Sequence, residues 1–321
     1  MMGEGPAAMG GRNVTSTPRT VAVCGATGRQ GGAVVRSLLG RGWTVRALTR
    51  KPTRARARSL HILGAQVLHA DMDEPESLRA AFAGAAGVFS VQNGIANGFD
   101  REIAQGRNVA DAARAAGVHH IVYGSAGPGR SGAGTGVPSW EAKVPVEDHI
   151  RSLGVSFTIL RPTAFMELMT DRSFYPAVGT WRIWPRLTGT DRPIPWLSVA
   201  DTGAIAATVF GDPARFQGKD LPLAADLRTL DECRALYREA VGRDPRTFPM
   251  PQFMFDRFTK GDPSALWRWL RTGEVSADVE ATRAILPSAR SVRAWLQAEQ
   301  PADPARHLAP GEEATNDASE P

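Results

Sequence analysis

Three glycines, Gly25, Gly28 and Gly31, stand between a short apolar run and an amphipathic segment near the start of the chain. Residues 21–24 (VAVC) are apolar throughout, which is typical of a strand buried on both faces of a parallel sheet. Residues 32–42 repeat apolar side chains at helical spacing. A glycine turn between a strand and a helix lets a pyrophosphate approach the backbone, where the helix N-terminus offers N–H donors. The spacing therefore predicts a dinucleotide site rather than a turn that binds nothing.

The expected ligand contacts at this turn include side chains as well as glycines. They are Gly25, Thr27, Gly28, Arg29, Gln30 and Gly31. The glycines would admit the phosphates, and the helix that follows would supply the positive end of its dipole.

Basic side chains, and no carboxylate, follow the second expected strand. The chain has no Asp or Glu between residues 4 and 71. In dinucleotide sites a carboxylate at this point holds the ribose 2′-hydroxyl of NAD, whereas arginine accommodates the 2′-phosphate of NADP. The basic residues there are Arg50, Lys51, Arg54, Arg56 and Arg58. We expect Arg50 to contact the 2′-phosphate, with Lys51 or Arg54 assisting. A solvated basic helix face is the alternative, but it leaves the missing carboxylate unexplained, so the sequence favours NADP(H).

Polar residues after the third and fourth expected strands extend the same site. Asp71 and Met72 follow the third strand, and Gln92 and Asn93 follow the fourth. Ligands of doubly wound sheets bind outside the carboxyl ends of the strands, so Asp71 is expected at the adenine end and the two amides at ribose or substrate. Helix capping, for which Asp73 is the better-placed residue, equally explains the aspartates, and turn chemistry equally explains Asn93.

These residues need a common scaffold, which the order of elements supplies. Strand-like runs alternate with amphipathic helical patterns along the first half of the chain. The expected strands are residues 20–24, 43–48, 65–70, 87–91, 119–124 and 156–161. The expected helices lie near residues 31–41, 54–63, 75–84, 100–116 and 140–153. This alternation predicts an α/β fold with a doubly wound parallel sheet of the Rossmann type.

The composition of the chain limits which ligands, cellular location and membrane association are expected. The 321 residues carry a formal net charge of +5 without a block of basic residues, which favours anionic small ligands over a nucleic-acid groove. Two cysteines, Cys24 and Cys233, make no disulfide framework, so a cytoplasmic location is expected. No apolar run approaches the roughly 18 residues of a membrane span. Residues 1–19 are expected to form a disordered leader without a signal peptide, and residues 299–321 a disordered acidic tail.

Several segments occur in an order typical of one protein family. They are GATGRQGGAVVRSLL, VRALTRKP, HADMDEPESL, GVFSVQN, WEAKVPVEDHIRSLGVSFTILRPTAFME and WLSVADTGAIAA. As a set they resemble the NmrA-like family of atypical short-chain dehydrogenase/reductases. The resemblance implies a Rossmann domain, here residues 20–155, and a smaller C-terminal α+β substrate domain, here residues 156–298. It implies that the two domains interleave at the sixth strand and that NADP(H) binds between them. It also implies either a reductase of quinones, enones and related aromatic substrates or an NADP(H)-binding regulator.

The proton donor usual in short-chain dehydrogenases is missing. These enzymes use a Tyr-x-x-x-Lys pair, in which the lysine lowers the tyrosine pKa and the tyrosine exchanges the proton. Counting back four from Lys143 reaches Ser139, and none of the three tyrosines has the right spacing. The resemblance places Lys143 beside the nicotinamide ribose. In some reductase members this lysine is itself the acid or base, which a pKa lowered by partial burial would permit. A helical i,i+4 pair with Glu147 is the structural alternative.

Other residues are expected near the nicotinamide. Ser125 follows the fifth strand, where short-chain reductases carry a substrate-orienting hydroxyl, although starting a turn would equally explain it. The resemblance places Thr163 and Phe165, after the sixth strand, beside nicotinamide and substrate. The glycine-rich residues 126–138 are expected to form a mobile lid.

Two functions follow from these expectations. The first is an oxidoreductase that passes hydride from NADPH to a small conjugated or aromatic acceptor of the quinone or enone type. Lys143, Ser125 or solvent would then supply the proton. A quinone tolerates the missing tyrosine because its reduced dianion is stabilised by resonance and water. The second function is a redox-sensing regulator that binds NADPH and a protein partner. Neither uses a metal, because the adjacent His119 and His120 of a strand point to opposite faces.

Overall fold

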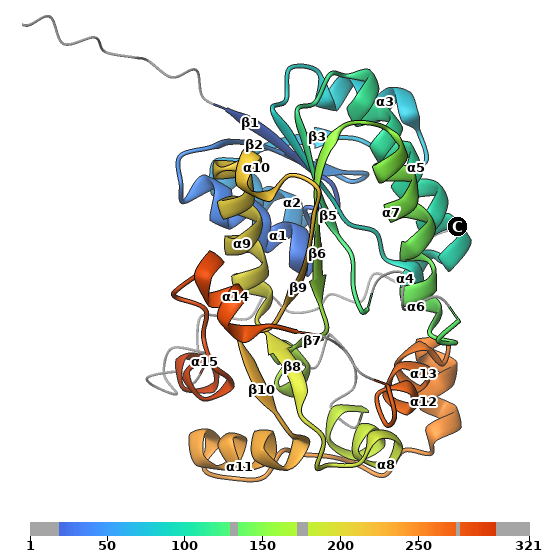
Figure 1. The fold of residues 1–321 in the computed structure, drawn as a ribbon, viewed down its shortest axis with the longest axis vertical. Coiled ribbons are helices and arrows are strands. Elements are labelled where there is room, and N and C mark those ends of the chain that lie inside the picture. Colours follow the sequence, from blue (N-terminus) through green and yellow to red (C-terminus); the bar gives the residue numbers. More distant parts are fainter. Residues whose placement is uncertain (1–18, 129–133, 172–178, 274–276, 300–321) are drawn as a thin grey trace, which may run out of the picture.

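A seven-stranded parallel sheet organises the residues that the computed structural model describes, which are 19–128, 134–171, 179–273 and 277–299. Its strand order is β3-β2-β1-β4-β5-β6-β9 (Figure 1). The strands are β1 (Thr20–Val23), β2 (Thr44–Thr49), β3 (Gln66–His69), β4 (Gly87–Ser90), β5 (His120–Gly124), β6 (Ser156–Pro162) and β9 (Lys219–Leu223). The order changes direction between β1 and β4, so the predicted doubly wound α/β fold of the Rossmann type is confirmed.

Helices cover both faces of this sheet, which explains why its central strands are apolar throughout. Val21, Ala22 and Val23 of β1 are fully buried between β2 and β4. On one face lie α1 (Arg29–Leu39), α2 (Ala55–Ile62) and α9 (Val199–Gly211), and on the other α3 (Pro75–Phe82), α5 (Phe99–Ala115) and α7 (Lys143–Ser152) (Figure 1). The helices α1 and α9 pack closely, because a Cβ on Gly203 would lie 2.5 Å from the carbonyl carbon of Ala33.

A smaller, three-stranded sheet lies beyond the carboxyl end of β6 (Figure 1). Its order is β10-β8-β7, formed by β10 (Asp226–Arg228), β8 (Ile194–Leu197) and β7 (Ala164–Phe165). The helices of this region are α8 (Trp184–Thr188), α11 (Leu230–Val241), α12 (Gln252–Thr259) and α13 (Asp262–Trp269). Trp184 and Trp267 are buried and stack with ring centroids 5.1 Å apart, so α8 and α13 share an aromatic core.

The chain passes more than once between the two sheets. After β8 it returns to the large sheet through α9, α10 (Pro213–Phe216) and β9, and then enters β10. The remaining elements are α4 (Gly94–Asn97), α6 (Pro138–Glu141), a 3-10 helix (Met166–Met169), a π-helical turn (Gly179–Ile183), α14 (Val279–Ile285) and α15 (Val292–Glu299). The division into residues 20–155 and 156–298 stays a prediction. Of the expected leader and tail, residues 1–18 and 300–321 lie outside the described residues.

Two adjacent histidines at the start of β5 differ sharply in burial. His119 is exposed, whereas His120 is 2% exposed, and its ring nitrogens lie 2.7 Å from Ser156 Oγ and 2.9 Å from Thr158 Oγ1. Burial lowers the pKa of His120 to about 4. Between about pH 6.5 and about pH 4 the unfolded chain therefore binds a proton that the folded chain does not. The free energy of unfolding consequently decreases as the pH is lowered through this range.

We expect a His120→Gln variant to lose less stability in acid than the wild type does. Between pH 7 and about pH 4 the free energy of unfolding of the wild type should fall by about 2–3 kcal/mol more than that of the variant. Denaturant titrations at several pH values measure this difference. His119→Gln, which changes the exposed neighbour, should keep the wild-type pH dependence. Parallel pH curves for all three proteins would contradict the assignment.

Candidate functional site

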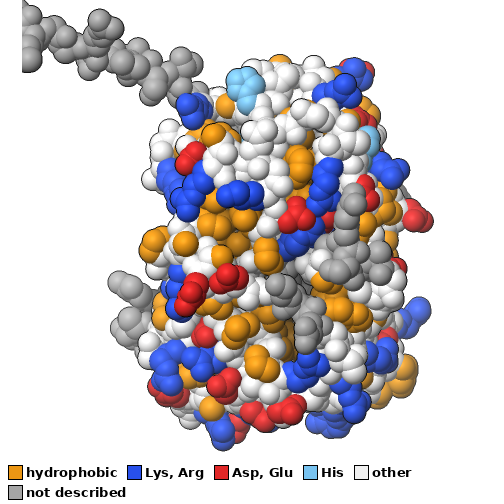
Figure 2. Space-filling model, in the orientation of Figure 1, with side chains coloured by type: hydrophobic (Ala, Val, Ile, Leu, Met, Phe, Trp, Pro, Cys, Tyr) orange, Lys and Arg blue, Asp and Glu red, His pale blue; other side chains and the backbone are white. Residues whose placement is uncertain are grey.

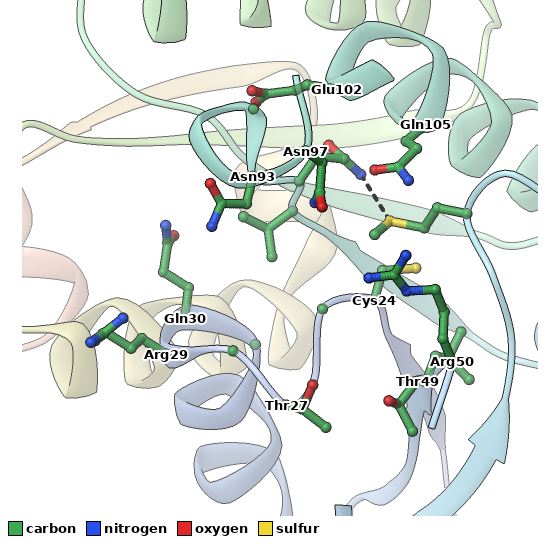
Figure 3. A pocket seen from close by; sticks show the side chains of 18 of the residues that line it. Cys24, Thr27, Arg29, Gln30, Thr49, Arg50, Asn93, Asn97, Glu102 and Gln105 are labelled. Carbon is green, nitrogen blue, oxygen red and sulfur yellow. Dashed lines mark hydrogen bonds between the residues drawn. The ribbon is translucent and has the colours of Figure 1, made fainter. Parts of the chain in front are cut away.

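A cavity of about 520 Å³ opens at the carboxyl ends of β1, β2, β3 and β4 (Figure 3). The predicted site residues that line it are Gly25, Thr27, Gly28, Arg29, Gln30, Gly31, Arg50, Asp71, Met72, Gln92, Asn93, Lys143 and Phe165. Lys51, Ser125 and Thr163 do not line it. The sheet thus brings together most of the residues that sequence reasoning had placed at the ends of separate strands.

The turn between β1 and α1 brings the backbone to the edge of this cavity. Gly25 has a φ of +64°, a left-handed conformation that favours glycine, and its carbonyl oxygen accepts the Gly28 N–H at 2.9 Å. A Cβ on Gly31 would lie 2.3 Å from the same oxygen, so only glycine lets α1 pack against the turn. The helix has no acidic residue in its first turn. Its N-terminal partial charge therefore favours an anionic ligand.

Two arginines line the cavity beyond the end of β2. Arg50 follows the strand directly, and Arg56 lies in the first turn of α2. Lys51 and Arg54, the expected assistants of Arg50, do not line the cavity, and the Lys51 side chain is exposed. Sequence reasoning did not single out Arg56, because the side chain of this basic run that points toward the cavity depends on the residue at which α2 begins.

The two aspartates after β3 have different surroundings. Asp71 lines the cavity, and its Oδ1 accepts the Asp73 N–H at 3.1 Å. Asp73 accepts hydrogen bonds from Arg101 Nε at 2.9 Å and Gln105 Nε2 at 3.0 Å, and the Arg101 bond is the main reason why the pKa of Asp73 is lowered. The alternative that Asp73 caps α3 is wrong, because the helix begins after Glu74 without a side-chain cap and Asp73 has a charged partner on α5.

Three glutamines that line the cavity each have a buried side-chain oxygen. Gln30, Gln92 and Gln105 all line it, and within the described part of the chain the Oε1 atom of each is buried without a hydrogen-bond partner. Gln92 is fixed by its other amide atom, which donates to Ser90 Oγ at 2.9 Å. An unsatisfied buried acceptor costs about 1–3 kcal/mol, so a ligand donor would be stabilised here once the amide rotates its oxygen toward the cavity. The ribose hydroxyls, adenine amine and carboxamide of a nicotinamide dinucleotide fit this requirement. Gln105 lies mid-helix on α5, and no motif in the sequence marks it as a site residue.

Lys143 forms a buried ion pair with Glu102 on the cavity wall. The distance between Nζ and Oε1 is 2.6 Å, and the two side chains are 10% and 2% exposed. Burial is the largest single effect and lowers the pKa of Lys143, but the Glu102 carboxylate, together with Tyr123 and Glu147, outweighs burial, so the pKa of Lys143 is raised. The lowered pKa expected from the sequence is therefore corrected, and Lys143 is an ammonium group at neutral pH.

Ser125 is engaged in a buried ionic network away from the cavity. Its Oγ donates to Glu147 Oε1 at 2.5 Å, and Arg161 donates to both oxygens of Glu147 at 2.5 Å. Arg161 also donates to Asp220 on β9 at 3.0 Å. These contacts join β5, α7, β6 and β9, so the geometry gives Ser125 and Glu147 a part in stability. The expected substrate-orienting role of Ser125 has no support in this arrangement.

The chain matches one protein family along most of its length. Residues 17–263 match the NmrA-like family. This chain belongs to the NmrA-like family. One curated relative is the NmrA-like family domain-containing oxidoreductase FrzB from Cladobotryum sp. It is 33% identical to this NmrA-like protein over 254 residues, and the match covers 72% of this chain and 76% of FrzB. Such relatives support an oxidoreductase in general.

Solved structures share the architecture of this NmrA-like protein. NmrA, a negative transcriptional regulator, in complex with NADP superposes with a TM-score of 0.68 at 22% identity, over 88% of this chain and 95% of the other. The triphenylmethane reductase of Citrobacter sp. complexed with NADP(H) gives a TM-score of 0.68 at 22% identity, over 88% of this chain and 100% of that one. At this identity the likeness concerns the fold alone.

The described lining residues of the cavity in this NmrA-like protein include no tyrosine. Tyr123 of β5 is fully buried, with its ring centroid 5.8 Å from Lys143 Nζ. Phe165 lines the cavity, whereas Thr163 is half-buried outside it. Of the lid expected over 126–138, residues 129–133 lie outside the described residues. Lys143 is the lysine among the described residues that line the cavity.

The face of the NmrA-like protein in Figure 2 has mixed charge. On the face shown in Figure 2, Lys and Arg side chains are interspersed with Asp and Glu instead of forming one basic stripe. No helix in the described ranges is long and apolar enough to cross a membrane. Within those ranges, no three His, Cys, Asp or Glu side chains are grouped as ligands of a metal ion would be. The cavity is therefore the feature on which a functional proposal can be built.

Proposed function

We propose that this protein is an NADPH-dependent oxidoreductase that transfers hydride to a small conjugated acceptor such as a quinone or an enone. One observation carries the proposal: a single cavity joins the glycine turn, two arginines, three unsatisfied glutamine oxygens and the Lys143 ammonium. The first three features suit an anionic dinucleotide. The fourth suits an acceptor that gains negative charge on reduction. The oxidoreductase name of the relative FrzB supports the same class of activity.

The charges near β2 favour NADP(H) over NAD(H). Arg50 and Arg56 would hold the 2′-phosphate, and the chain has no carboxylate after β2 until Asp71. The unsatisfied glutamine oxygens would accept hydrogen bonds from ribose hydroxyls or the adenine amine. Asp71 would lie at the adenine end. When bound, NADPH supplies the hydride.

Lys143 would replace the missing tyrosine at the acceptor. Hydride addition to a quinone or enone leaves an anionic oxygen, which the Lys143 ammonium stabilises by its charge and a hydrogen bond. Because the pKa of Lys143 is raised, transfer of its proton to that oxygen is completed as water returns a proton to the amine. A quinone needs little further help because its reduced form spreads the charge over the ring. A plain ketone gives a localised alkoxide and depends more strongly on a dedicated acid. Conjugated acceptors are therefore the proposed substrate class.

One observation favours a second function, a sensor of the NADPH/NADP ratio that binds a protein partner. Both predicted catalytic side chains already have buried partners. Lys143 forms an ion pair with Glu102, and Ser125 donates a hydrogen bond to Glu147. A sensor must bind the two redox forms with unequal affinity, because a ligand that binds both states equally shifts no equilibrium. Unequal affinity combined with no turnover would favour the sensor.

Oxidation of NADPH by the purified protein, measured with a panel of quinones, enones and imines, tests the enzyme. We expect turnover of at least one quinone and a kcat about 100-fold lower in Lys143→Gln, since a positioned proton donor contributes about 10²–10⁴-fold. Glutamine keeps a donor toward Glu102, so the Kd for NADPH should stay within about threefold.

Lys219→Gln, which changes an exposed lysine on β9, is the matched control and should behave like the wild type. Unchanged turnover in Lys143→Gln would remove Lys143 from its role and keep the oxidoreductase. Binding of NADPH without oxidation of any acceptor would contradict the enzyme and favour the sensor.

A further inference from the structure

One carboxylate inside the cavity, Glu102, has no counterpart among the needs of a dinucleotide. It is 1% exposed and reaches the cavity from α5, on the side away from Thr49 and Arg50 (Figure 3). Its Oε1 accepts a hydrogen bond from Lys143 Nζ at 2.6 Å. On its other side, a Cβ on Gly94 would lie 2.2 Å from Glu102 Oε2, so glycine at the start of α4 leaves the carboxylate its room. The site is thus shaped around this side chain.

A buried negative charge in a cavity for an anionic ligand requires a specific reason. Removing a carboxylate from water is costly unless a partner of opposite charge compensates it. Phosphates gain nothing from a nearby carboxylate, so the anionic part of the dinucleotide does not explain Glu102. The Lys143 ammonium does explain it, because a buried lysine without an anion would tend to lose its proton.

The other ionisable groups around Lys143 come from several elements. Tyr123 on β5 presents its ring at 5.8 Å from Nζ. Glu147, one helical turn further along α7, is paired with Arg161 and has the smallest of the upward effects on the pKa of Lys143. Asp262 at the start of α13 accepts the Ser139 N–H at 2.7 Å, and burial raises its pKa. Among the described residues, Glu102 is the carboxylate in hydrogen-bonding contact with Nζ.

We infer that Glu102 is a positioning residue, which fixes Lys143 Nζ at the acceptor end of the cavity and keeps it charged as the proton donor. The inference rests on the proposed function. In the reduction, a hydride with its two electrons adds to the acceptor and leaves an oxyanion. One proton passes from Lys143 Nζ to that oxygen, and water returns a proton to the amine. Glu102 remains ionised throughout and forms or breaks no covalent bond.

Lysine NMR tests the effect of Glu102 on Lys143 directly. The chain has four lysines, Lys51, Lys143, Lys219 and Lys260, so isotope-labelled lysine gives few side-chain signals, and Lys143→Gln assigns one of them. In the wild type we expect Lys143 to stay charged to the highest pH at which the protein is folded. In Glu102→Gln it should lose its charge at lower pH than the other three lysines, because burial then acts without a compensating anion.

Asp100→Asn provides a matched control, because it removes an exposed carboxylate from the first turn of the same helix. The Lys143 signal of this variant should titrate as in the wild type. An unchanged Lys143 titration in Glu102→Gln would overturn the inference, whatever the turnover of the protein.

The pH profile of turnover tests the positioning role. In Glu102→Gln, kcat should fall about tenfold per pH unit above the new lysine pKa, while the wild type stays level over the same range. Glu102→Asp, which restores the charge, should recover much of the wild-type profile. A loss of kcat that is equal at every pH would mark Glu102 as merely structural and overturn the inference. If Lys143 responds to Glu102 but the wild type reduces no acceptor, the proposed function fails while the charge-holding contact is supported.

Discussion

Replacement of Gly31 by alanine is expected to lower the affinity for NADPH by at least about 100-fold. The added Cβ would lie 2.3 Å from the carbonyl oxygen of Gly25, 2.6 Å from its carbonyl carbon and 2.9 Å from the nitrogen of Ala26. All three atoms belong to the backbone, so no side-chain rotation relieves the contact. The turn that would cradle the pyrophosphate must therefore move. Fluorescence titration with NADPH measures the loss, and thermal denaturation verifies that the variant is folded.

Gly32→Ala is the matched control for this variant. The position is adjacent in the same helix, but the nearest atom to an added Cβ, the oxygen of Ala26, is 3.3 Å away. Alanine is favoured over glycine inside a helix by about 1 kcal/mol, which offsets the tighter contact. We expect affinity close to that of the wild type. Equal losses in both variants, or no loss in Gly31→Ala, would contradict the role assigned to this turn.

Arg50→Asp is expected to weaken NADPH binding about 100-fold and to leave NADH binding within about threefold. The variant loses a charged hydrogen bond to the 2′-phosphate, and its new carboxylate repels that phosphate. The same carboxylate can accept a hydrogen bond from the 2′-hydroxyl of NADH. Kd values for both cofactors, measured side by side, give the change in selectivity.

Arg58→Asp separates this contact from a general effect of charge. Arg58 is exposed on α2 and does not line the cavity, but its replacement changes the net charge by the same amount. The ratio of the two Kd values should be that of the wild type. If Arg50→Asp leaves the ratio unchanged, Arg50 has no part in recognising the 2′-phosphate. If both variants shift it equally, long-range charge rather than contact is responsible.

The two ends of the cavity differ in charge, which bears on what each would bind. Arg50 and Arg56 give the end near β2 an excess of positive charge. At the other end Lys143 and Glu102 form a pair without net charge. A phosphate is favoured at the first end, whereas an uncharged acceptor such as a quinone is compatible with the second. The pair can still respond to an oxyanion, because the lysine proton is held close to the cavity.

The sequence by itself determined the features that depend on short segments of chain. Strands and helices followed from apolar periodicity, and the glycine turn followed from spacing at residues 25, 28 and 31. The lack of a carboxylate before Asp71 and of a Tyr-x-x-x-Lys pair can likewise be read from residue order. The expected doubly wound parallel sheet is confirmed, because alternating strands and helices have few ways to pack without crossing.

Only the tertiary structure decided the partners of the charged side chains. Lys143 lies 41 residues beyond Glu102, and no local pattern links them. They meet because α5 and α7 pack side by side on one face of the sheet (Figure 1). Packing of α5 beside the turn before α3 gives Asp73 its partner Arg101. Packing of α7 against the sheet engages the Ser125 hydroxyl with Glu147. Whether a buried charge has a partner depends on which helix faces lie together, and that is a property of the packed layers rather than of any one segment.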